Sequence, residues 1–238
     1  MIHLPDCSVS DTHARGLRRA EDRQIDRRRS NWETQRSPRR FGPRVRQTHA
    51  DLLAVYGEGR VILAESTKKS ALWLVASHER DDLYHLVYFS IERAHHRLMR
   101  SKKQLPLAAT GHCYERFIQG LLRHDLDWVC LMTNTFEALI AATDFERGPA
   151  TQDSHEHVRW HAPAAYKVWV PQGLVIVEVP EHGDAVMKTV IAMDALIGPN
   201  RDLWDVLGES DIKARSFARR PVIDWFEEPA ECALEEVA

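Results

Sequence analysis

The sequence predicts an α+β domain in which an antiparallel β-meander packs against two helices, preceded by a disordered, arginine-rich arm. Two observations carry this prediction. Two amphipathic helical segments occupy residues 110–140, and three apolar segments with two-residue alternation follow within 166–193. Short turns between such strands favour antiparallel pairing, with the helices on one face of the sheet. A chain of 238 residues can bury a sizeable core without disulfides or a metal.

Charge is unevenly distributed along the chain and sets the predicted division. Residues 1–48 contain twelve arginines and six acids, whereas residues 222–238 contain six acids and no basic residue. We therefore divide the chain into a basic arm (1–48), a single α+β domain (49–221) and an acidic tail (222–238). The arm has too few apolar residues to offset its ordering entropy, so we expect it to be disordered.

Arginine-rich arms bind phosphate backbones through charge and bidentate hydrogen bonds. A solvated leader without a function is the alternative interpretation of this arm. If the arm binds nucleic acid, the candidate residues are Arg27, Arg28, Arg29, Arg39 and Arg40.

The predicted domain opens with apolar segments that are typical of strands. RVILAE (60–65) and ALWLVAS (71–77) flank a polar turn and are expected to pair. LYHLVYFSI (83–91) is a third candidate strand, with a helix as the alternative. The following ERAHHRLMRSKKQ (92–104) is expected to be more helical.

Helical periodicity is clear after Thr110. Apolar residues in HCYERFIQGLLRHD (112–125) recur every three or four positions, and Thr110 can cap this helix. Asp127 can cap a second helix whose apolar positions continue to Ile140.

The period then changes to that of strands. YKVWV (166–170), a Pro-Gln-Gly turn and LVIVEV (174–179) predict a hairpin. AVMKTVIAM (185–193) predicts a third strand, and DLWDVL (202–207) a short amphipathic helix before the tail.

Several function classes are disfavoured by what the sequence lacks. It has no GxGxxG, P-loop, GxSxG, HExxH or EF-hand motif, so the classical dinucleotide, nucleotide, hydrolase and zincin enzymes are not leading interpretations. We expect no cofactor.

The four cysteines lie far apart with no CxxC pair, which indicates a reducing compartment. No run of about 20 apolar residues is present, so we expect a cytoplasmic protein without a membrane partner.

Three groups of residues could carry chemistry. His112 and Arg116, at helical i and i+4 positions, would project from one face and could address one anionic ligand. An ordinary surface helix is the alternative. The other groups are a set on the strands, Tyr166, Lys167, Lys188 and Thr189, and a set of histidines, His155, His157 and His161.

The strand set could contact a phosphate, although a lysine that protects a sheet edge is an equally good interpretation. Strict alternation would place Lys188 on one side of its strand, and Met187 and Thr189 on the other. The histidine set could form a zinc or iron triad, with an ordinary polar linker as the alternative.

The order of these features resembles the barnase/EndoU/colicin/RelE-like (BECR) group of small RNases and toxin domains. The similarity covers about residues 105–194, through LPLAATGHCYERFIQGLLRHDLDWV, then YKVWVPQGLVIVEV, then AVMKTVIAM. In that group a helix with an H-A-x-x-R-like motif precedes a β-meander. The resemblance matches His112 and Arg116 to the helix motif, Tyr166 or Lys167 to an early strand position, and Thr189 to a late one.

This resemblance implies a metal-independent endoribonuclease toxin domain that uses the RNA 2′-hydroxyl as its nucleophile. His112 would act as acid or base, Arg116 with Lys188 or Lys167 would stabilise phosphate charge, and Thr189 would orient a phosphate oxygen. The implied partners are RNA and a cognate protein inhibitor or antitoxin. Two alternatives stay open: a non-catalytic interaction protein (immunity, antitoxin or mobile-element accessory) and a metalloenzyme that uses the histidine set.

Overall fold

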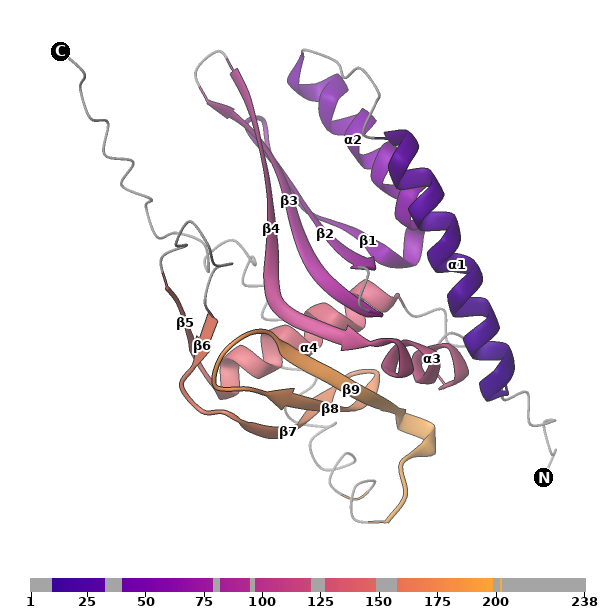
Figure 1. Ribbon diagram of the computed structural model, residues 1–238. Helices are drawn as coiled ribbons and strands as arrows, with labels where there is room; N and C mark the ends of the chain where they lie inside the picture. The colour runs from indigo at the N-terminus through magenta and orange to yellow at the C-terminus, as the bar shows by residue number, and fades with distance from the viewer. Residues whose placement is uncertain are drawn as a thin grey trace.

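Seven strands build one twisted sheet, which is the centre of the computed structural model (Figure 1). The structure describes residues 10–32, 40–78, 82–94, 97–120, 127–148, 158–198 and 202. The strand order is β1-β2-β3-β4-β9-β8-β7. All neighbours pair antiparallel except β4 and β9, which are parallel. The α+β class and the mainly antiparallel sheet are thus confirmed.

The strands of this sheet come from two parts of the chain. The seven strands are β1 (Val61–Ser66), β2 (Ser70–His78), β3 (Leu83–Ala94), β4 (Arg97–Thr110), β7 (Ala164–Val170), β8 (Gly173–Val179) and β9 (Ala185–Ala192). A separate two-stranded sheet consists of β5 (Phe145–Arg147) and β6 (Val158–Trp160). The helices are α1 (Asp11–Trp32), α2 (Phe41–Tyr56), α3 (Gly111–Gly120) and α4 (Trp128–Ala142), with short 3₁₀ turns at Glu58–Arg60 and Met193–Ala195.

Two hydrophobic cores lie on opposite faces of the first half of the sheet. Along β2, Leu74 and Ala76 join the core that contains α3, α4 and the inner face of β7–β9. Trp73 and Val75, which point to the other face, join the core formed with α2 and the second half of α1. Because β2 is covered on both faces, its central residues form a continuous buried run rather than an alternating one.

The predicted strands 60–65, 71–77, 83–91, 166–170 and 174–179 are confirmed, and 185–193 corresponds to β9. The helical expectation for 92–104 is wrong. That segment completes β3 and forms the first part of β4, paired over a long antiparallel hairpin. Cross-strand backbone pairing overrides the local helical preference there. Of the segment 202–207, only Asp202 lies within the described residues.

The arm differs from the disorder that its composition predicts. Residues 11–32 form α1, which Ser10 caps through its side-chain oxygen and the amide of His13. Residues 41–56 form α2, so the division expected at residue 48 falls inside a helix. Both helices lie along one side of the sheet (Figure 1). Residues 1–9 and 33–39 lie outside the described residues.

A mixed stripe of charged and apolar residues holds α1 in place. Ala14, Arg18, Asp22 and Ile25 recur at helical spacing and are all buried. Composition alone missed this stripe because two of its four members are charged, and their partners come from other elements. None of the helices in the described part of the chain combines the length and apolarity needed to cross a bilayer.

Candidate functional site

The first turn of α3 is joined to β9 through one side chain. The hydroxyl oxygen of Thr110 accepts a hydrogen bond from the Cys113 amide at 3.1 Å, which confirms the predicted cap. The same hydroxyl donates to the carbonyl oxygen of Lys188 at 3.1 Å. A hydrogen bond therefore links the start of α3, which carries His112 and Arg116, directly to β9, which carries Lys188 and Thr189.

His112 and Arg116 share the exposed face of α3. Apart from these two, every residue of α3 is buried or half-buried. The Arg116 guanidinium donates to Gln119 Oε1 at 3.0 Å and lies 3.7 Å from a carboxylate oxygen of Asp11. Because Gln119 also donates to Asp11, the start of α1 helps to orient Arg116.

Cys113, the neighbour of His112, faces the core and is fully buried. Burial raises the pKa of its thiol well above the ordinary value, since a thiolate would lose its hydration there. A thiol held in its neutral form is a poor nucleophile. Cys113 is therefore not a candidate nucleophile, and the exposed polar side chains of α3 are those of His112 and Arg116.

The strand residues divide between the two faces of the sheet. Lys167 pairs with Ile176, and Ile176 with Thr189, so these three side chains form a row across β7, β8 and β9 on the outer face. Tyr166 points the opposite way, packs against the core and donates its hydroxyl to the Ala162 carbonyl at 2.7 Å. Of the two early-strand candidates, only Lys167 shares a face with Thr189.

A β-bulge in β9 changes the direction in which its side chains point from the one expected. Val177 pairs with Met187, but the adjacent Ile176 pairs with Thr189, so Lys188 is an extra residue in the ladder. Met187 is consequently buried in the core while Thr189 lies on the outer face. Strict alternation would have placed Met187 and Thr189 on the same side, and that expectation is wrong.

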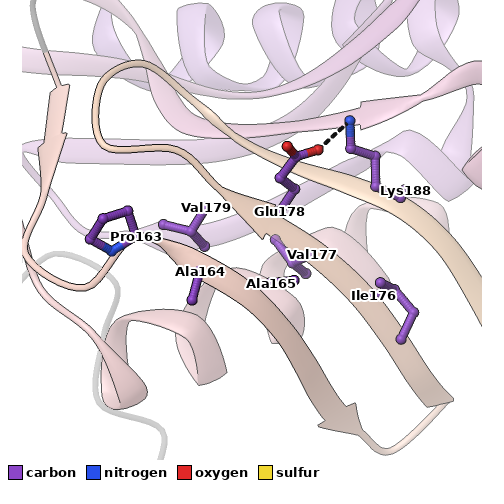
Figure 2. A pocket seen from close by; sticks show the side chains of 8 residues that line it. All are labelled: Pro163, Ala164, Ala165, Ile176, Val177, Glu178, Val179 and Lys188. Atoms are coloured by element: carbon purple, nitrogen blue, oxygen red, sulfur yellow. Dashed lines mark ion pairs between the residues drawn. The ribbon is translucent and has the colours of Figure 1, made fainter.

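Lys188 lies at a shallow hollow of about 440 Å³ on the outer face of β7–β9 (Figure 2). Its ammonium nitrogen lies 2.6 Å from Glu178 Oε2, and Figure 2 shows the two side chains meeting above the sheet. The rest of the lining is mainly apolar, with Ala165 and Ile176 among its members. Because Glu178 neutralises Lys188, this hollow offers little net charge to a phosphate.

The helix pair and the strand row form two separate groups. In the described part of the chain, no hydrogen bond or ion pair joins His112 or Arg116 to Lys167, Lys188 or Thr189. Gly120 of α3 packs against Ala192, on the inner side of β9. The exposed face of α3 and the outer face of the sheet are therefore distinct surfaces.

The five arm arginines also separate into different environments. Arg27 and Arg28 are exposed on α1, and Arg40 is exposed at the start of α2. Arg29 is half-buried and donates to the Ser77 hydroxyl and to the His78 carbonyl, at 3.2 and 2.8 Å. Its contacts hold α1 against β2. Arg39 lies outside the described residues.

The histidine set is only partly within the described residues. His161 is exposed, with its Nε2 3.4 Å from Glu146 Oε1, whereas His155 and His157 lie outside the described residues. Among the residues that the structure describes, no three histidine, cysteine or acidic side chains converge as a metal site would require. The metal hypothesis stays a prediction.

No family model, curated protein or solved structure matches this chain. The comparisons therefore neither support nor contradict the resemblance described above.

One charged feature of the surface was missed by the sequence interpretation. Four basic side chains surround a second hollow of about 590 Å³, between the start of α2 and the turn end of the β3–β4 hairpin: Arg40, Lys68, Arg93 and Arg97. The signal was present as Lys68-Lys69 and as the run RLMRSKK (97–103). These segments were not grouped because only the tertiary structure brings them together.

Proposed function

We propose that this protein is a metal-independent endoribonuclease whose catalytic surface is the exposed face of α3. The observation that supports the proposal best is the pairing of His112 with Arg116 on a helix that is otherwise buried or half-buried. An imidazole one helical turn from a guanidinium supplies a group that transfers protons and a group that binds phosphate.

Cleavage would use the RNA itself as the nucleophile. The 2′-oxygen forms a bond to the adjacent phosphorus, and the bond between phosphorus and the 5′-oxygen breaks. The products are a 2′,3′-cyclic phosphate and a 5′-hydroxyl. His112 either removes the proton from the 2′-hydroxyl or protonates the leaving 5′-oxygen. Arg116 stabilises the negative charge on the phosphorane, and its contacts with Asp11 and Gln119 hold it in place.

In this proposal the strand residues take no direct part, because Lys167, Lys188 and Thr189 lie on a different surface from the exposed face of α3. Thr110 fixes the start of α3 against β9 and so helps to position His112. A cognate protein inhibitor would need only to cover the exposed face of α3 to block access to His112. Its expected contacts are therefore acidic groups that pair with Arg116.

The test compares the wild-type protein with His112→Ala on end-labelled RNA in EDTA. We expect the variant to lose about 10²–10⁴-fold in cleavage rate, the usual contribution of a positioned acid or base. His182→Ala is the matched control, because His182 is exposed and lies on the turn before β9. Its cleavage rate should equal that of the wild type. The fragments should end in a cyclic phosphate.

Full cleavage by His112→Ala would contradict the assignment. If folded wild-type protein cleaves no RNA in EDTA and none after zinc or manganese is restored, the protein is not a ribonuclease. A non-catalytic interaction protein would then be the better interpretation.

A further inference from the structure

We infer that the hollow between the start of α2 and the β3–β4 hairpin binds the phosphate backbone of a single RNA strand. We call it the basic groove and define it by Arg40, Lys68, Arg93 and Arg97. It is distinct from the α3 surface. The choice of RNA as the occupant rests on the proposed function, whereas the phosphate chemistry rests on the groove itself.

The groove concentrates positive charge from three distant parts of the sequence. Arg40 comes from the start of α2, Lys68 from the turn between β1 and β2, and Arg93 and Arg97 from the β3–β4 hairpin, and none of the described acidic residues lines the hollow. The chain as a whole has a net charge of −3, so this positive region is local and does not follow from overall composition. Clefts lined by one sign of charge focus the field and attract counter-charged ligands.

The four defining cations are available to a ligand. All four side chains are exposed, and none of them makes an ion pair with another described residue. The remaining lining residues, Phe41, Gly42 and Leu98, contribute no negative charge. An anion that entered the groove would therefore relieve the mutual repulsion of these groups.

The backbone at the start of α2 adds hydrogen-bond donors to the same place. No side chain in the described part of the chain caps this helix, and Arg40 occupies its N-cap position. Gly42 lines the groove, and open space lies where its Cβ would be. Uncapped amides at a helix N-terminus bind phosphate oxygens, and here they lie beside basic side chains.

The opposite wall of the groove is held in a defined conformation. The Thr67 hydroxyl accepts hydrogen bonds from the amides of Lys69 and Ser70, at 3.1 and 2.9 Å, which fixes the turn that presents Lys68. The Arg93 amide donates to the Lys69 carbonyl at 2.7 Å and joins this turn to β3. Because the backbone of this turn is already fixed, no loop entropy is lost there when the groove binds a ligand.

The lining favours a single strand over a duplex. Phe41, which packs partly against the core of α2, and Leu98 add half-buried apolar surface to the lining of the groove. Proteins that bind single-stranded nucleic acid combine a basic groove with aromatic side chains on which unpaired bases stack. A duplex would present only phosphates and sugars to this apolar surface.

Figure 1 shows the start of α2 beside the first part of β4, and α3 at the other end of that strand. β4 contains 14 residues, which corresponds to a chain length of about 45 Å at about 3.3 Å per residue. Arg100, Lys102 and Lys103 are exposed along the part of β4 that begins at the groove. A strand held in the groove can follow Arg100 and Lys102, which share one face of β4, in the direction of α3, whereas Lys103 lies on the opposite face.

The test measures binding of a fluorescent 2′-O-methyl RNA 20-mer by anisotropy. This RNA has no free 2′-hydroxyl and so cannot be cleaved by the proposed reaction. The test variant is Arg93→Glu/Arg97→Glu. The control is Arg19→Glu/Arg159→Glu, which changes the net charge equally at exposed sites on α1 and β6. Circular dichroism and thermal unfolding confirm that both variants are folded.

We expect the groove variant to bind at least about tenfold more weakly near 0.1 M salt and to show a shallower salt dependence, because it contacts fewer phosphates and therefore releases fewer counterions in total. The control variant should bind within about twofold of the wild type. His112→Ala should bind like the wild type, because the groove does not contain α3.

Equal weakening by the groove and control variants would overturn the inference, since only the overall field would then matter. Absence of binding by the wild type, or tighter binding of a duplex or of DNA than of the single-stranded RNA, would also overturn it. Binding that requires the groove, in a wild-type protein that cleaves no RNA, would support the groove and reject the proposed nuclease function.

Discussion

Tyr84 on β3 donates its phenolic hydrogen to the carboxylate of Asp22 on α1, with the hydroxyl oxygen 2.9 and 2.8 Å from the two carboxylate oxygens. Both side chains are buried. Beside them, the guanidinium of Arg60 lies 5.0 and 4.5 Å from the ring centroids of Tyr84 and Tyr114. Arg60 also lies 3.0 Å from a carboxylate oxygen of Glu21 on α1. Charged and aromatic groups therefore dock a helix that contains few apolar residues.

Tyr84→Phe should weaken this docking. The substitution keeps the ring but leaves the buried Asp22 carboxylate without its donor, which costs about 1–3 kcal/mol of unfolding free energy. Tyr166→Phe is the control, because its hydroxyl bonds only to the Ala162 carbonyl at the surface. Urea unfolding of both variants measures the difference. If both variants lost the same small amount of unfolding free energy, the contact between Tyr84 and Asp22 would not stabilise the fold.

Stability should fall at alkaline pH. Burial raises the pKa values of Tyr84, Tyr114 and Cys113 above the ordinary values of 10.0 and 9.0. The folded protein keeps these protons, whereas the unfolded chain releases them above about pH 9–10. The stabilisation is thus complete below pH 9 and declines as the pH rises, at a rate that approaches about 1.4 kcal/mol per pH unit for each group once the pH exceeds the pKa of that group in the unfolded chain.

Urea unfolding at pH 8, 9.5 and 10.5 measures this decline. The Tyr84→Phe variant has one such group fewer, so its stability should fall less steeply with pH. A stability that stayed constant up to pH 10.5 would contradict the burial of these three side chains.

Two glycine substitutions should have opposite effects. Gly16→Ala in α1 meets open space, and alanine in a helix interior stabilises by about 0.5–1 kcal/mol relative to glycine. Gly173 has a φ of +145°, and a Cβ there would clash with the carbonyl oxygen of Ile191. Gly173→Ala should cost about 1–3 kcal/mol or more. Thermal unfolding of the two variants measures both changes in stability. If Gly16→Ala left the stability unchanged, this would argue against a helical conformation at Gly16.

Thr110→Ala should affect both stability and cleavage. It removes the cap of α3 and the bond to the Lys188 carbonyl, which should cost about 0.5–2 kcal/mol. In the proposed mechanism it also displaces His112, so RNA cleavage should slow. Thr110→Ser retains the hydroxyl and should restore both properties. Failure of serine to rescue would indicate that the methyl group, rather than the hydrogen bonds, is what matters.

Much of the fold could be predicted from local pattern. The hairpin of β7 and β8, the strand β9 and the cap of α3 follow from two-residue alternation, a short turn and a threonine at a helix start. The segment 92–104 could not be predicted in this way, because its charges suit an exposed helix as well as an exposed hairpin. Only pairing with β3 selects the strand.

The candidate site was predictable to a similar degree. Helical spacing correctly placed His112 and Arg116 on one face of α3. The orientation of Thr189 was not predictable, since a one-residue bulge at Lys188 reverses the alternation. Bulges depend on the partner strand, which a local pattern does not contain.

By itself, the sequence determined the fold class, most strands, the two core helices and the shared face of His112 and Arg116. These features depend on spacing between near neighbours, which periodicity records. The tertiary structure alone decided that α1 docks on Arg60 and Tyr84, and that Arg40, Lys68, Arg93 and Arg97 surround one groove. Ion pairs between distant residues, and the gathering of distant basic side chains around one groove, depend on the path of the chain through space. No local pattern of residues encodes that path.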